Sequence, residues 1–260
     1  MKKIGYLLLM LLFVVSCGKK TEEKSTTSES NGEKTYKIGI TQIVSHPVLD
    51  STRQGFEDAF KEAGLKVEFD EQNAQGEIPT ANVIANKFVT DKVDLIFSIA
   101  TPTTQAVVNA TSTIPVVFSA VTDPQSAGLL KENVTGSSDR VDNVGEQLDI
   151  LKELNPNAKT IGILFSSSEQ NSITQVEAIK KVAAEKGIEV VEQSVTSASE
   201  ITQALSNLLP KVDALYIPTD NLVVSNMPAV VERANAAKKI VIATDEGSVA
   251  TGALYTKGID

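Results

Sequence analysis

The sequence predicts an α/β protein with two doubly wound, Rossmann-like lobes, a hinge, and a central ligand cleft. Three observations support this fold class. Short β-branched runs alternate with longer amphipathic segments, which is typical of a parallel sheet wound with helices. One run, VDLIFSIA at 93–100, is apolar along most of its length, as in a sheet covered on both faces. The alternation stops once, in a Gly- and Ser-rich segment, and then resumes, so we expect two lobes.

Residues 1–16 are predicted to be a signal peptide. Two lysines precede an uncharged apolar run over 4–15, which is short of the roughly 20 residues that a membrane-spanning helix needs. Cys17 follows at once and is the only cysteine, so it has no disulfide partner. The segment 14–17 resembles the lipobox of bacterial lipoproteins, which implies that Cys17 is diacylated and becomes the mature N-terminus. Two acyl chains anchor a protein durably to a membrane.

Residues 17–35 are predicted to be the lipidated cysteine and a flexible tether. Ser, Thr, Lys and Glu dominate this stretch, and ordering it would lose entropy without burying apolar surface. Loss of the signal peptide removes two lysines, so the net charge falls from −9 to −11. Because so acidic a protein has no electrostatic reason to bind nucleic acid or anionic lipid, we expect no nucleic-acid partner.

The first series of elements begins at residue 36. The segment 36–43 reads as a strand, and 47–64 as a helix with Phe56, Phe60 and Ala63 on one stripe and a stop signal at Gly64. The same criteria predict strands at 66–70, 93–100 and 114–121 and helices at 77–91 and 102–109. The segment 133–139 is rich in turn-forming residues and is predicted to be a short strand or a crossover.

The second series repeats this order without a detectable sequence repeat. Helices are predicted at 142–154, 169–187, 199–209 and 223–237, and strands at 159–166, 188–193, 213–219 and 239–244. The last segment, 252–260, reads as extended and is expected to return to the first lobe. The predicted lobes are therefore 36–141 plus 249–260, and 142–248.

Polar side chains gather in the loops that follow the predicted strands, where open α/β sheets bind ligands. These loops carry neutral hydrogen-bond donors and carboxylates but no Lys or Arg, which suits a polar or zwitterionic ligand. Thr101, before Pro102, is predicted to be a helix N-cap beside N–H groups that can hold a carboxylate. Asp220 or Asp245 could bind a ligand ammonium. Each residue could equally be a simple helix cap, but capping explains only one polar residue per loop.

His46 is the only histidine. Catalysis would need a nucleophile and an orienting carboxylate beside it, and one histidine makes no metal site without carboxylate partners. We therefore expect His46 to cap a helix or line a pocket. The sequence has no P-loop, no G-x-S-x-G, no CxxC and no HExxH motif. It predicts a protein that is not an enzyme and that has no cofactor and no metal site.

Six segments resemble those of a known family and occur in the same order along the chain: IGITQIVSHPVLDSTRQGFEDAF, DLIFSIATPTTQA, IPVVFSAVTDP, IGILFSSSEQNS, YIPTDN and ATDEGSVATGAL. Over residues 36–260 they resemble the ABC-transporter substrate-binding lipoproteins that bind aromatic amino acids. The resemblance implies a type I periplasmic-binding-protein fold that closes on its ligand and docks on permease and ATPase subunits. The family usually continues after GID with a helix that contains Tyr and Gly, and this sequence departs from the pattern there.

The pocket that the resemblance implies is built from residues of all six segments. They are His46, Thr101, Thr103, Ser119, Asp123, Ser167, Asn171, Asp220, Asn221, Asp245 and Glu246. Phe118, Phe165, Tyr216 and Tyr255 could form a slot for an aromatic side chain, although such residues are more often part of the core. Nothing in the spacing distinguishes Trp, Tyr or Phe as the ligand.

Alternative functions remain at this point. The protein could bind another small polar solute, it could be a sensory or chemotactic lipoprotein with a receptor as its partner, or it could be a surface hydrolase. We expect a monomer that is exported and is lipid-anchored to the outer face of the cytoplasmic membrane or lies in the periplasm.

Overall fold

The computed structural model describes residues 34–140 and 144–256. The predicted signal peptide, Cys17 and most of the tether lie outside these residues. The compact unit begins at Lys34, slightly before the predicted start, and the Lys34 ammonium lies 2.7 Å from Asp94 Oδ1. Among the described residues, no helix is both long and apolar enough to cross a membrane.

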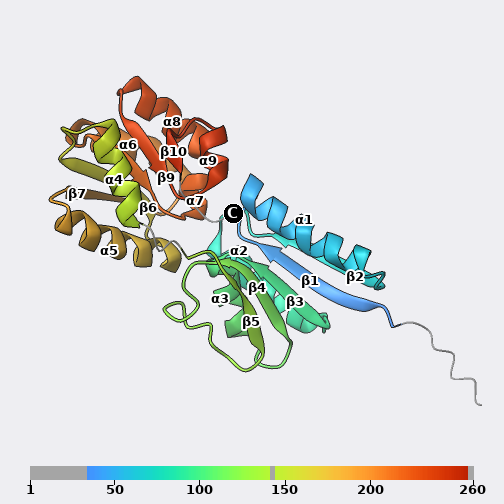
Figure 1. Ribbon diagram of the computed structural model, residues 1–260. Coiled ribbons are helices and arrows are strands. Elements are labelled where there is room, and N and C mark those ends of the chain that lie inside the picture. The colour runs from blue at the N-terminus through green and yellow to red at the C-terminus, as the bar shows by residue number, and fades with distance from the viewer. Residues whose placement is uncertain (1–33, 141–143, 257–260) are drawn as a thin grey trace, which may run out of the picture. The chain divides into compact units, whose positions relative to one another are not determined.

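Two parallel five-stranded sheets make up the fold, which confirms the predicted fold class (Figure 1). The first sheet has the strand order β2-β1-β3-β4-β5. Its elements, which form the first lobe, are β1 (Tyr36–Gln42), α1 (Pro47–Glu62), β2 (Val67–Asn73), α2 (Ile78–Thr90), β3 (Leu95–Ile99), α3 (Thr101–Ala110), β4 (Val116–Val121) and β5 (Val134–Ser138).

Helices cover both faces of the first sheet, with α1 on one face and α2 and α3 on the other (Figure 1). On the α1 face the rings of Phe56 and Phe97 stack with their centroids 3.9 Å apart. On the other face Phe88 of α2 packs over Gly39 of β1, where a Cβ would lie 2.7 Å from the ring. Only glycine fits at that position, because the helix packs directly on the strand backbone.

The second sheet has the strand order β10-β9-β8-β6-β7. Its elements, which form the second lobe, are α4 (Val144–Leu154), β6 (Thr160–Ser166), α5 (Gln170–Glu185), β7 (Glu189–Val195), α6 (Ala198–Leu208), the short helix η1 (Leu209–Lys211), β8 (Ala214–Ile217), α7 (Asn221–Val224), α8 (Met227–Ala236), β9 (Ile240–Ala243), α9 (Glu246–Ala250) and β10 (Tyr255–Thr256). Alternate residues of β6 enter two cores: Ile161 and Ile163 pack with α4 and α5, and Leu164 packs with α6 and α8.

The structure differs from the sequence prediction in two places, both late in the chain. The predicted helix 223–237 is two helices, because the chain turns at Ser225 and Asn226 and α8 restarts with a proline in its first turn. The segment 249–260 was predicted to return to the first lobe, but Tyr255 pairs with Ile242 in the second sheet. The short α9 and the turn at Gly252, whose φ is 110°, bring the chain back beside β9.

Candidate ligand-binding cavity

A cavity of about 640 Å³ lies among loops from both lobes, a size within the range of roughly 300–1,000 Å³ typical of small-molecule sites. We call the residues of the first lobe that line it the first wall: they come from the start of α1 and from the ends of β4 and β5. The second wall comes from the second lobe, at the start of α5 and in the loops after β8 and β9. Most of these loops follow the carboxyl ends of strands, where ligands bind open α/β sheets.

Seven of the eleven residues predicted from the sequence line this cavity: His46, Ser119, Asn171, Asp220, Asn221, Asp245 and Glu246. The other four predicted residues are not in its lining: Thr101, Thr103, Asp123 and Ser167. For each of the four residues outside the lining, the local structure explains why it does not face the cavity.

The two threonines are turned into the first lobe because α3 begins directly after β3. Ala100, with φ at 82°, occupies the N-cap position, so Thr101 is the first helical residue and not the predicted N-cap. Both side chains are buried, and Thr103 Oγ1 donates to the Ile99 carbonyl oxygen at 2.6 Å. The carboxylate site predicted at this helix start therefore does not open into the cavity.

Asp123 and Ser167 have local roles. Asp123 Oδ1 accepts hydrogen bonds from the N–H groups of Gln125 and Ser126, both at 3.0 Å, and so caps a turn. Ser167 is exposed in the loop after β6, and its N–H donates to the Val195 carbonyl oxygen at 3.1 Å.

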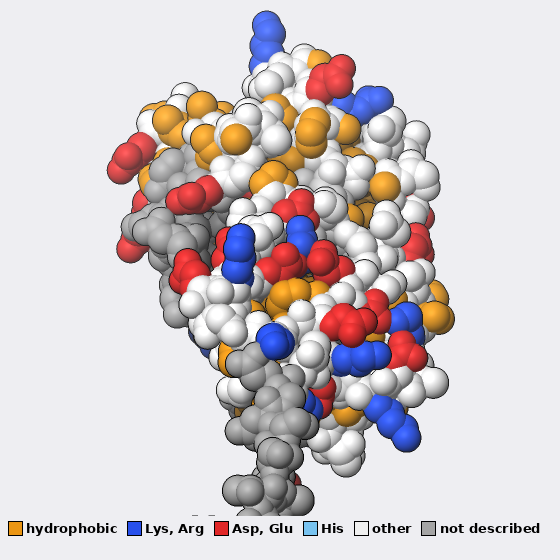
Figure 2. Space-filling view, turned by 90° about the vertical axis from the view of Figure 1, so that its right-hand side faces the viewer, with side chains coloured by type: hydrophobic (Ala, Val, Ile, Leu, Met, Phe, Trp, Pro, Cys, Tyr) orange, Lys and Arg blue, Asp and Glu red, His pale blue; other side chains and the backbone are white. Residues whose placement is uncertain are grey.

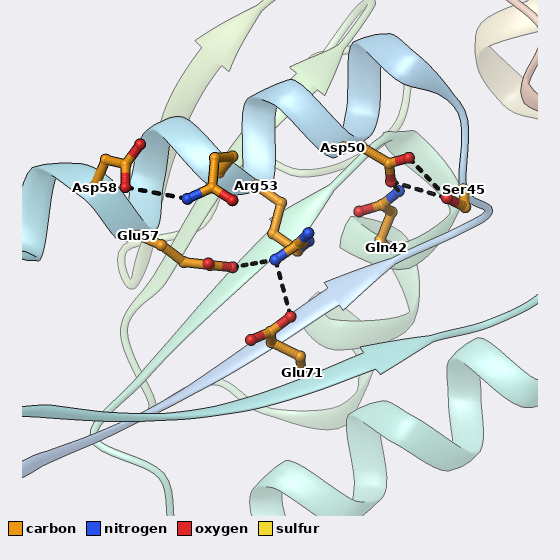
Figure 3. A network of polar contacts seen from close by, with 8 residues as sticks. Gln42, Ser45, Asp50, Arg53, Glu57, Asp58 and Glu71 are labelled. Carbon is orange, nitrogen blue, oxygen red and sulfur yellow. Dashed lines mark hydrogen bonds and ion pairs between the residues drawn. The ribbon is translucent and has the colours of Figure 1, made fainter.

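Asp50 fixes the loop that carries His46 (Figure 3). Its Oδ1 accepts from Gln42 Nε2 at 2.7 Å and its Oδ2 from Ser45 Oγ at 2.7 Å. The helix that follows, α1, has no side-chain cap and carries proline in its first turn, so its first N–H groups remain open to an anion. Arg53, farther along α1, is bound by Glu57 and Glu71 at 2.5 and 2.9 Å (Figure 3) and is absent from the lining.

Glu169 organises the second wall, although the sequence analysis did not select it. Only 4% of this residue is exposed, and its carboxylate accepts from the N–H groups of Asn221 and Leu222 at 3.1 and 2.9 Å. It also accepts from Asn221 Nδ2 at 2.5 Å and from Asn171 Nδ2 at 3.0 Å. Asn171 and Asn221 are thus held in place by a buried carboxylate, a role that cannot be read from a loop sequence.

Asp220 and Asp245 both cap helices in the second wall, which is the simpler of the two roles that the sequence allows. Asp220 accepts from the N–H groups of Ser166 and Val223 at 2.5 and 2.8 Å and from Ser172 Oγ at 2.6 Å. Burial, and then the nearby Glu169 carboxylate, raise the pKa of Asp220 to about 7. Asp245 accepts from Ser248 N and Oγ at 2.9 and 2.5 Å.

The sequence analysis missed Ser137, Ser138 and Asp139, which line the cavity at the end of β5. Within the segment 133–139, Val134–Ser138 form β5 of the first sheet, and Asp139 follows the carboxyl end of this strand in the first wall. Treating this segment as a strand would have applied the strand-end rule to it and selected Asp139. Burial raises the pKa of this carboxyl group.

The aromatic residues proposed for a slot belong to the core instead. Phe118, Phe165 and Tyr216 are buried in hydrophobic clusters, and Tyr216 Oη donates to Gln147 Oε1. The side chain of Tyr255 is not among those described. Within the described part of the chain the lining contains no Phe, Tyr or Trp, and its apolar side chains are Val48, Leu49, Ala120 and Val224.

Buried polar atoms without hydrogen-bond partners gather in this cavity. In the described ranges, seven side-chain atoms are buried and unpartnered, and four of them belong to lining residues: His46 Nδ1, Thr122 Oγ1, Asp139 Oδ1 and Asn171 Oδ1. Such atoms are rare in folded proteins because each costs about 1–3 kcal/mol. The described lining also carries four carboxylates and no Lys or Arg. On the face shown in Figure 2, Asp and Glu side chains lie across the middle of the molecule with Lys and Arg side chains among them.

The chain is similar to several known proteins. Residues 37–260 match the family model described as ABC transporter substrate binding protein. A tyrosine-binding protein of Clostridioides difficile is 43% identical over 98% of this chain and 77% of its own length. A crystal structure of an ABC domain in complex with L-Trp from Streptococcus pneumonia is 38% identical, with a TM-score of 0.82, over 86% of this chain and 79% of that one. The leucine-binding protein of Thermotoga maritima shares the fold, with a TM-score of 0.63 at 18% identity over 84% of this chain and 66% of that one.

Proposed function

Because this chain belongs to the ABC transporter substrate-binding protein family, we propose that the cavity between its two walls binds an aromatic amino acid. The family membership itself makes the chain the extracytoplasmic solute-binding component of an ABC transporter, a binding protein and not an enzyme. The fold is that of the type I periplasmic binding proteins. The ligand class and the residues that contact it are the proposal.

The observation that carries the proposal is the set of four buried, unpartnered polar atoms in the cavity lining. Two of them are unambiguous acceptors. Asp139 Oδ1 belongs to a carboxyl group, and Asn171 Oδ1 is assigned because its amide nitrogen donates to Glu169 and to the Thr219 carbonyl oxygen at 2.7 Å. A ligand with several N–H donors would satisfy them, and an α-ammonium group has three.

The carboxylate of an amino acid has a complementary place at the start of α1. The uncapped N–H groups there carry the positive end of the helix dipole, and His46 Nδ1 is unpartnered beside them. Burial lowers the pKa of His46 despite the nearby Asp245 and Asp50 carboxylates. The imidazole is therefore neutral at pH 7 and can offer one N–H to the carboxylate.

The similar proteins support the aromatic class. One is a tyrosine-binding protein and another has L-Trp bound. In this chain the side chain of the ligand would pack against Val48, Leu49, Ala120 and Val224, the apolar part of the lining. A cavity of about 640 Å³ accommodates a ring of either size. Another small polar solute with an ammonium group is the alternative ligand.

We also propose that Cys17 carries the lipid anchor and that the residues after it tether the binding protein to the outer face of the membrane. The basis is the apolar run before Cys17 and the polar, core-free composition after it. The protein would act as a monomer that delivers its ligand to the permease.

Thermal unfolding of residues 18–260 with each of the twenty amino acids tests the ligand class. A ligand at about 100 times its Kd adds roughly 2.7 kcal/mol, which raises Tm by a few degrees for a chain of this size. We expect the shift with Trp, Tyr or Phe alone. No shift with these three, or equal shifts with aliphatic amino acids, would contradict the proposal.

A matched pair of serine variants tests the cavity. Ser119 lines the cavity and Ser167 does not, although both were predicted from the sequence. We expect Ser119→Ala to weaken binding roughly 2- to 10-fold, the value of one neutral hydrogen bond, and Ser167→Ala to leave Kd unchanged. Equal effects of the two variants would place the ligand elsewhere.

A further inference from the structure

The cavity lining holds four acidic side chains, Asp139, Asp220, Asp245 and Glu246. Any of them could pair with a ligand ammonium, and the sequence favours Asp220 and Asp245. The number of hydrogen bonds that each carboxylate already accepts separates them, because an oxygen that holds backbone N–H groups has little capacity left for a ligand.

Both aspartates of the second wall already accept hydrogen bonds with both of their carboxylate oxygens. Asp220 accepts three hydrogen bonds, from Ser166 N, Ser172 Oγ and Val223 N, and both of its oxygens are used. Asp245 accepts from Ser248 N with one oxygen and from Ser248 Oγ with the other. Turning either carboxylate toward a ligand would uncap α7 or α9.

Asp139 differs from both. Its Oδ1 is buried and has no hydrogen-bond partner. Its position is nevertheless fixed, because its N–H donates to the Val121 carbonyl oxygen at 3.1 Å, and the neighbouring Ser138 Oγ donates to the Thr122 carbonyl oxygen at 2.9 Å. Among the described residues, only the Thr122 hydroxyl and the Asp139 N–H lower the pKa of this carboxyl group, and neither is a cation, so this rigidly held acceptor is suited to a cationic donor from outside the protein.

Thr122 adds a second open atom to the same wall. It is 3% exposed, and its Oγ1 is also buried and unpartnered. Among the lining residues that the structure describes, no Lys or Arg is present to neutralise Asp139. Burial raises the pKa of Asp139 more than the Thr122 hydroxyl and the Asp139 N–H lower it, as expected of a carboxyl group with no Lys or Arg in the cavity lining. A buried charge is costly unless a charge of the opposite sign lies beside it, so a buried carboxylate favours a cation at its side.

We infer that Asp139, together with Thr122 Oγ1, is the residue that binds the ammonium group of the ligand and selects for a primary amine, and that Asp220 and Asp245 are structural caps. This inference rests on the proposed function, because it assumes a ligand with an α-ammonium group. Asn171 Oδ1 is the open acceptor of the second wall and supplies a further hydrogen bond to the same ligand.

The test is calorimetric titration of wild type, Asp139→Asn and Asp58→Asn with L-tyrosine, L-tryptophan and their deaminated analogues. Asp58→Asn is the matched control, because Asp58 is exposed on α1 and absent from the cavity lining, and the variant removes the same charge by the same substitution. We expect Asp139→Asn to weaken binding of the amino acid about 10- to 100-fold, as loss of a hydrogen bond to a charged group does. Asp58→Asn should stay within about twofold of wild type.

The preference for the amino acid over its deaminated analogue should collapse in Asp139→Asn and persist in Asp58→Asn. The Tm of Asp139→Asn without ligand should equal or exceed that of wild type, since the substitution removes a partly buried charge that has no cation in the cavity lining, so a lost affinity cannot be ascribed to unfolding. Wild-type affinity in Asp139→Asn, or an equal loss in Asp58→Asn, would overturn the inference alone. Failure of the wild type to bind any aromatic amino acid would overturn the proposed function and the inference with it.

Discussion

In the second lobe, Asp220 of the second wall and Glu169 beside it accept hydrogen bonds with every carboxylate oxygen, whereas in the first wall Thr122 and Asp139 each keep a buried oxygen without a partner. The backbone conformation differs too. Ala120 of the first wall has a φ of 55°, a region that L residues adopt at a cost, and no described residue of the second wall has a positive φ.

The comparison suggests that these polar groups have different roles in the two lobes. Polar groups that bind one another stabilise the fold, and polar groups that are left open are the ones that a ligand can bind. Strain and unpaired buried groups collect at functional sites because the rest of the protein holds them in place. We expect substitutions of Glu169 and Asp220 to change stability and those of Thr122 and Asp139 to change affinity.

The largest effect should come from Glu169→Ala, which removes the carboxylate that holds the second wall. It leaves the buried N–H groups of Asn221 and Leu222 and two amide side chains without their acceptor, and each unsatisfied donor costs about 1–3 kcal/mol. We expect the free energy of unfolding to fall by about 3–5 kcal/mol in urea titrations.

Glu177→Ala is the control for this substitution. Glu177 lies on α5 with 67% of its side chain exposed, so its loss should change stability by no more than about 0.5 kcal/mol. If Glu169→Ala were as mild as Glu177→Ala, the second wall would not be the stabilising one.

The next effect is a pH dependence of stability that comes from Asp220. Burial and then Glu169 raise its pKa in the folded state to about 7, against about 3.9 in an unfolded chain. Between these pH values the folded state holds a proton that the unfolded state has released. The contribution of Asp220 to stability is thus full below about pH 4 and is lost as pH rises through about 7.

Asp220→Asn removes this titration. Relative to wild type, the variant should gain stability from about pH 4 to about pH 7 and then level off, even if the two proteins differ in stability by a constant amount, and urea titrations at intervals across that range measure the difference. A difference between the two proteins that does not vary with pH would refute the raised pKa.

The smallest effect should come from Ala120→Gly in the first wall. Glycine adopts a φ of 55° without the Cβ penalty, which outweighs its extra entropy in the unfolded chain, so we expect a gain of about 0.5–1 kcal/mol. Ala178→Gly, at an exposed position in the middle of α5, is the matched control and should lose about 1 kcal/mol. A loss of stability in both variants would mean that Ala120 is not strained.

The alternation of strands and helices could be predicted from the sequence because the spacing of apolar residues within each element reflects which of its side chains are buried. The break between α7 and α8 was missed because Asn226 and Pro228 interrupt an amphipathic pattern that continues across them. The helix α9 was missed because five residues are too few to show a helical period.

The candidate site was predictable in part. The strand-end rule selected the loops after β1, β4, β8 and β9, which line the cavity, but it also selected Thr101, whose helix begins without a loop and turns its side chain inward. Whether a carboxylate such as Asp220 caps a helix or stays open, as Asp139 does, depends on contacts between segments far apart in the chain. No local pattern encodes those contacts.

Calorimetric titration of the wild-type protein with L-tyrosine and L-tryptophan, and with analogues of each that lack the amino or the carboxylate group, tests the central claim most directly. If the open groups of the first wall bind the two charged ends of an amino acid, loss of either end should weaken binding by about 10-fold or more. Analogues that bind as tightly as the amino acids would show that only the ring is recognised, and would contradict the assignment of the first wall.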